Sequence, residues 1–123
     1  MKAPLLDLAG RILLGLIFLL AGVNKIFDYT GTQEYMEMFG VPGILLPAVI
    51  LIEILGGLSL ALGIKARWAA IALAGFTLIA GALFHADFGN QNELNHFLKN
   101  LAIIGGLLMV VLHGAGKWRL GPN

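Results

Sequence analysis

Four ionisable side chains and one amide fall inside or at the edges of long apolar stretches of this 123-residue chain. They are the groups most able to do chemistry: Arg11, Glu53, His85, Lys99 and Asn100. An ionisable group at membrane depth costs about 2.5 to 3.5 kcal/mol on insertion scales, so it usually has a partner and often a function. We therefore take these five residues as the candidate functional set.

The depths of these groups can be estimated from the ends of their apolar stretches. Counted from the expected cytoplasmic boundary at about 1.5 Å per residue, the depths are about 9 Å for Arg11, 15 Å for Glu53, 20 Å for Lys99 and Asn100, and 25 Å for His85. If the faces that carry them converge, the groups form a polar ladder along the axis of a helix bundle. Lys25 lies 14 positions after Arg11, nearly four helical turns on, and would cap the outer end of this ladder.

Glu53 is the most informative of these residues because it lies near the middle of its stretch. It either forms a buried ion pair with Arg11 or Lys99 that fixes helix register, or it transfers protons. We favour Arg11 as its partner. Snorkelling to the headgroups is the alternative for both Arg11 and Lys99.

The charges of the ladder do not balance. Arg11 and Lys99 against Glu53 leave one excess positive charge if all three are ionised, and an apolar interior resists such an excess. Either Lys99 is neutral or exposed, or the interior accepts an electron-rich or anionic ligand. His85 and His96 belong to an expected loop without rigid helical spacing, so no metal site is predicted.

The elements that must position these residues are membrane-spanning helices. Charged residues make up 12% of the chain and hydrophobic residues 59%, which leaves too few polar side chains for a water-exposed surface. A span needs about 20 mostly apolar residues. Four segments satisfy this, at about 5–23, 44–63, 68–84 and 97–113. The sequence predicts an all-α integral membrane four-helix bundle, with residues 1–123 as a single transmembrane domain.

The distribution of charge predicts the orientation of the bundle. Lys and Arg gather in the link at 63–68 and in the C-terminal tail, whereas the loops at 24–43 and 85–96 are acidic on balance. Basic ends belong in the cytoplasm. We therefore expect an inner-membrane protein with both termini cytoplasmic. The first outer loop should contain a short helix with Thr30 or Thr32 as its N-cap.

Glycine is abundant inside the predicted spans, where small residues let helix backbones approach closely. These glycines are Gly15, Gly22, Gly56, Gly57, Gly75, Gly81, Gly105 and Gly106. The chain has no cysteine, which excludes disulfides and thiolate metal sites. Its net charge of +1, with no long block of one sign, does not suggest a nucleic-acid partner.

Three segments carry a resemblance to a known family. They are GRILLGLIFLLAGVNKIFD, IEILGGLSLALGIKARWAA and HFLKNLAIIGGLLMV, in which a glutamate precedes a Gly-Gly pair and a Lys-Asn pair precedes another. Across nearly its whole length the chain resembles the DoxX family of small bacterial and archaeal membrane proteins. The resemblance implies a four-helix inner-membrane protein that serves as an oxidoreductase subunit. Some relatives are small subunits of a quinone-linked enzyme, and others join membrane-bound oxidant-defence complexes.

The leading hypothesis is a quinone-interacting subunit of a membrane oxidoreductase system. Arg11, Lys99 and Asn100 would donate hydrogen bonds to the oxygens of a quinone, and Glu53 with His85 would relay protons. The sequence suggests no covalently bound cofactor, so the electrons would come from other membrane or peripheral redox subunits. Homo-oligomerisation stays open. The alternatives are a small proton-coupled transporter and a non-catalytic structural or assembly subunit.

Overall fold

The computed structural model describes residues 4–84 and 89–123, and within these ranges the regular structure is entirely helical. The elements follow in the order α1 (Pro4–Phe27), α2 (Tyr29–Met38), the 3₁₀ turn η1 (Gly43–Leu45), α3 (Leu46–Leu62), α4 (Ala66–Phe84) and α5 (Gln91–His113). Four segments are long and apolar enough to cross a membrane, namely α1, η1 with α3, α4 and α5. The predicted all-α fold with four spans is confirmed.

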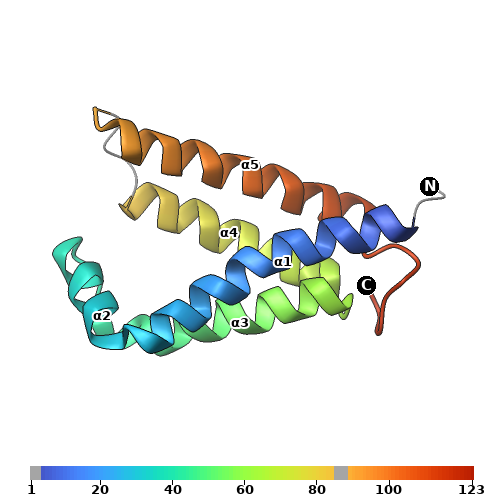
Figure 1. Ribbon diagram of the computed structural model, residues 1–123, viewed down its shortest axis with the longest axis horizontal. Coiled ribbons are helices and arrows are strands. Elements are labelled where there is room, and N and C mark those ends of the chain that lie inside the picture. Colours follow the sequence, from blue (N-terminus) through green and yellow to red (C-terminus); the bar gives the residue numbers. More distant parts are fainter. Residues whose placement is uncertain (1–3, 85–88) are drawn as a thin grey trace.

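The four long helices form two pairs (Figure 1). α1 packs along α3, and α4 packs along α5, with α3 and α4 joining the pairs. The two pairs lie close together where the chain ends and diverge toward the end that carries α2 (Figure 1). Large apolar side chains such as Leu13 and Leu112 point outward, as a bundle surrounded by lipid requires.

Two glycines bring α1 and α3 into direct backbone contact. A Cβ added to Gly15 would lie 2.6 Å from the carbonyl oxygen of Gly57, and one added to Gly57 would lie 2.8 Å from that of Gly15. Only glycine permits this approach. The packing role predicted for the intramembrane glycines therefore holds at this crossing. It does not hold for Gly75 and Gly105, whose missing Cβ positions face open space among the described residues.

Two helix starts differ from the prediction. α5 begins at Gln91, because the side chain of Asn90 caps it by accepting hydrogen bonds from the backbone N–H groups of Asn92 (2.9 Å) and Glu93 (3.4 Å). His96 thus belongs to a helix, and its assignment to a loop was wrong. The Asn-x-x-Glu spacing is a recognised start signal that could have revealed this.

The short helix α2 was predicted correctly, but its N-cap was not. Asp28 occupies the N-cap position, and its side chain makes no capping hydrogen bond. The Thr32 hydroxyl, expected to cap, instead donates to the Asp28 carbonyl oxygen at 2.7 Å from within the helix. Because this threonine hydroxyl is bonded to the preceding turn from inside the helix, it does not cap the start of α2 at Tyr29.

The C-terminal segment after α5 folds back across the end of the bundle. The backbone N–H groups of Leu120 and Gly121 donate to the carbonyls of Leu62 (3.0 Å) and Gly63 (3.2 Å), at the turn between α3 and α4. The start of α1 lies at this same end (Figure 1). Both ends of the described chain are therefore on one side, as an even number of spans requires. That this side faces the cytoplasm stays a prediction.

Candidate functional site

A cavity of about 440 Å³ lies where the two helix pairs diverge. Its walls are mostly apolar and come from all five α-helices. The polar residues that line it are Lys25, Thr32, Tyr35, Glu53, Thr77, Lys99 and Asn100. Three members of the predicted set, Glu53, Lys99 and Asn100, therefore share one interior space.

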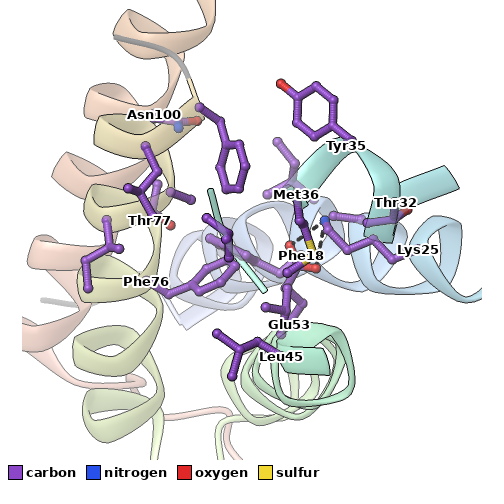
Figure 2. A pocket seen from close by; sticks show the side chains of 18 of the residues that line it. Phe18, Lys25, Thr32, Tyr35, Met36, Leu45, Glu53, Phe76, Thr77 and Asn100 are labelled. Carbon is purple, nitrogen blue, oxygen red and sulfur yellow. Dashed lines mark hydrogen bonds and ion pairs between the residues drawn. The ribbon is translucent and has the colours of Figure 1, made fainter. Parts of the chain in front are cut away.

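Glu53 is paired with Lys25 across the contact between α1 and α3. The Lys25 ammonium lies 2.9 Å from Oε1 and donates a hydrogen bond to Oε2 at 3.2 Å (Figure 2). The Glu53 side chain is 5% exposed and that of Lys25 is 27% exposed. Glu53 is held here because it lies on the buried face of α3, one turn from Ile50 and Gly57. Both carboxylate oxygens of Glu53 are therefore in contact with the Lys25 ammonium, and the pair forms part of the cavity wall.

The preferred pairing of Glu53 with Arg11 was therefore wrong. Arg11 is 2% exposed, and its guanidinium donates to the carbonyl oxygens of Leu60 (3.3 Å), Ala61 (3.0 Å) and Trp118. These bonds satisfy the last carbonyls of α3 and hold the C-terminal segment in place. Arg11 does not line the cavity. Its geometry is that of a structural residue at the end of the bundle.

The opposite wall carries Thr77 on α4 and Asn100 on α5 (Figure 2). The Asn100 side chain fits against α4 because the position opposite it is Gly81, where an added Cβ would lie 3.2 Å from Asn100 Nδ2. The Thr77 hydroxyl donates to the Leu73 carbonyl oxygen at 2.7 Å, so its oxygen remains an acceptor toward the cavity. Lys99 precedes Asn100 on α5, and no ion pair joins it to another described residue.

Three aromatic rings cluster at the outer end of the cavity, and two of them, Tyr35 and Phe84, line it. Tyr35 of α2, Phe39 directly after α2 and Phe84 at the end of α4 have ring centroids 5.0 to 5.5 Å apart, so the cluster joins α2 to α4. Burial and the nearby charge of Glu93 raise the pKa of Tyr35 above its usual value, which keeps its hydroxyl protonated as a donor. No local sequence pattern marks Tyr35 as a cavity residue, because it reaches the cavity through contacts between helices that are distant in the chain.

The charge count left open that Lys99 is exposed, and the structure shows this: Lys99 lines the cavity but its side chain is exposed. The buried carboxylate of Glu53 is balanced by Lys25. Lys25 occupies the outer end, as its spacing from Arg11 suggested. The fourth ladder position, His85, lies outside the described residues, so its predicted proton-relay role stays a prediction.

Comparisons with known proteins give the family. The DoxX family model matches residues 6–86 of this chain. Inner membrane protein YqjF of Escherichia coli K12 is 45% identical over 113 residues, which cover 92% of this chain and 87% of that protein. Inner membrane protein YphA of the same organism is 31% identical over 121 residues, covering 92% and 86%. No solved structure matches. The chain belongs to the DoxX family and is an integral, multi-pass inner-membrane protein.

Proposed function

We propose that this protein binds a quinone, or a similar apolar molecule with carbonyl or hydroxyl oxygens, as the small subunit of a membrane oxidoreductase system. One observation carries the proposal. The interior cavity is apolar over most of its wall, and its few polar groups include cationic and amide donors and a buried carboxylate paired with one of the cations. Ligand sites in proteins combine these same features.

The size of the cavity suits the ring of such a molecule. Its volume of about 440 Å³ falls within the range of roughly 300 to 1,000 Å³ common for small-molecule sites. Phe18, Phe76 and Ile103 supply flat or branched apolar walls for a ring and the start of an isoprenoid tail. A tail of this kind would continue into the surrounding lipid.

The polar groups are suited to both redox forms of the ligand. Lys99 and Asn100 would donate hydrogen bonds to a carbonyl oxygen, and the Glu53 carboxylate would accept one from a hydroxyl of the reduced form. Glu53 would take up a proton from this hydroxyl and pass it on, and Lys25 would stabilise the ionised form of the carboxylate. A quinone supplies two-electron chemistry, and in this proposal a partner subunit exchanges the electrons. The chain has no cysteine for an iron–sulfur cluster.

The membrane orientation forms part of the proposal. Lys65, Arg67, Lys117 and Arg119 all belong to the end of the bundle that the C-terminal segment covers. By the positive-inside rule this end faces the cytoplasm, and α2 with the aromatic cluster faces outward. The cavity then lies in the outer half of the membrane.

The test is a binding titration of the purified protein in nanodiscs with short-tailed ubiquinone and menaquinone analogues, followed by calorimetry. We expect saturable binding that weakens about fivefold in Asn100→Leu, for the loss of about 1 kcal/mol of hydrogen bonding. Decylbenzene, a probe of similar shape without oxygens, should bind this variant and wild type with equal affinity. Arg67→Gln, a charge change outside the cavity, is the matched control.

Two outcomes would reject the proposal. The first is the absence of saturable binding to wild type, and the second is equal affinity in wild type, Asn100→Leu and Glu53→Gln. Proton release from proteoliposomes on addition of a cationic drug would instead favour a transporter. A Glu53→Gln variant that loses stability without losing ligand or physiological function would indicate a purely structural subunit.

A further inference from the structure

A second hollow lies on the outside of the bundle, between the first half of α1 and the second half of α5. Its volume is about 1170 Å³, and we call it the α1–α5 groove. It exists because these two helices make few contacts with each other, compared with α1 against α3 or α4 against α5. Gly10 has no side chain to fill the groove, and nothing lies within 4 Å of the position its Cβ would take.

The groove is apolar along the span and charged at its end. Its apolar walls include Leu6, Leu13 and Met109, all of which are exposed on the protein. Its polar lining comes from Asp7 and Arg11 on α1, from His113, the last residue of α5, and from Lys117 just beyond it. An occupant must therefore be apolar over most of its length and polar where the helices end.

The charge at the polar end is positive on balance. Arg11 and Lys117 outnumber Asp7 even with His113 neutral. Both terminal nitrogens of Arg11 donate to backbone carbonyls beneath the C-terminal segment, so we expect its positive charge to attract an anion without touching it. Lys117 is exposed and free of any ion pair with the described residues, so its ammonium can bind a ligand anion.

We propose that the α1–α5 groove binds an anionic phospholipid, with its phosphate on Lys117 and His113 and an acyl chain along Leu6, Leu13 and Met109. A basic pocket between spans at the headgroup level is the usual form of a site for anionic lipid. The apolar length of the groove selects a lipid over a soluble anion. This site is separate from the interior cavity, and the proposal does not rest on quinone binding.

The two tryptophans of the chain allow a direct test. In a Trp68→Phe background only Trp118 remains, next to Lys117. The variant is reconstituted in phosphatidylcholine containing increasing amounts of brominated phosphatidylglycerol or brominated phosphatidylcholine. We expect brominated phosphatidylglycerol to quench Trp118 at a several-fold lower mole fraction than brominated phosphatidylcholine.

Substitutions at the groove should remove this preference selectively. Lys117→Gln should reduce the preference for phosphatidylglycerol over phosphatidylcholine about fivefold, the effect typical of one basic residue at a lipid surface. Lys65→Gln makes the same change at the same end of the bundle but outside the groove. This variant should keep a lipid preference within about twofold of that of the parent. Gly10→Leu places a side chain in open space in the groove and should lower quenching without changing any charge.

Equal quenching by the two brominated lipids in the parent would overturn the proposal. An equal loss of preference in Lys65→Gln and Lys117→Gln would also overturn it, because it would indicate a general surface attraction instead of a site. Far-UV circular dichroism of each variant checks that its helices are intact, and Gly10→Leu provides the test if Lys117→Gln does not fold.

Discussion

Loss of the Lys25 charge should destabilise this protein far more than loss of the Glu53 charge, although the two side chains form one ion pair. Lys25→Met leaves a carboxylate that is 5% exposed without its cation. Breaking a buried pair in this way costs about 3 kcal/mol. Glu53→Gln leaves an ammonium that is 27% exposed, in the last turn of α1, and free to extend toward the headgroups. We expect a cost of only about 1 kcal/mol.

The double variant Lys25→Met/Glu53→Gln should be nearly as stable as Glu53→Gln alone, because it contains no isolated charge. The coupling energy of the cycle should therefore be about 2 to 3 kcal/mol, within the range for residues in contact. The assay is the free energy of unfolding in mixed micelles, measured by SDS titration with far-UV circular dichroism. Lys99→Met is the control. It also removes a cation that lines the cavity, but Lys99 has no ion-pair partner among the described residues.

The reasoning would be refuted by either of two results. One is a Lys25→Met variant no less stable than Lys99→Met, which would mean that the carboxylate does not depend on its cation. The other is a double variant whose loss equals the two single losses together, which would mean that the side chains do not interact.

Three other predictions concern helix contacts and topology. Gly57→Ala should lower stability by about 1 to 3 kcal/mol, because its methyl group meets the backbone of α1, whereas Gly75→Ala faces open space and should be neutral or stabilising by up to about 1 kcal/mol in the same assay. Arg11→Lys should cost about 2 kcal/mol and speed tryptic cleavage of the C-terminal segment, since an ammonium cannot reach all three carbonyls; unchanged cleavage would contradict this. Because the chain has no cysteine, single variants Lys117→Cys and Glu34→Cys can be labelled with an impermeant maleimide, and only Glu34→Cys should react from the outside of intact cells.

The sequence determined the membrane class, the four spans and the family. Span formation depends on local length and apolarity, which a single segment carries by itself. The same logic singled out Glu53, since a carboxylate in the middle of an apolar span must face an interior. Depth along the bundle axis also brought Glu53, Lys99 and Asn100 to the same region, and the cavity they line agrees with this estimate.

Only the tertiary structure decided which charges meet. Arg11 and Lys25 share one face of α1, so the axial register of α1 against α3 decides which of them reaches Glu53, and apolar span ends define that register only to within a few residues. The glycine contact between Gly15 and Gly57 sets this register: it places Arg11 beside Leu60 and Ala61 and brings Lys25 to Glu53. Arg11 instead donates a hydrogen bond to the Trp118 carbonyl oxygen of the C-terminal segment. This contact joins residues more than 100 positions apart, and no local pattern encodes it. Pairing in this bundle is therefore a property of helix packing, whereas spanning is a property of each segment.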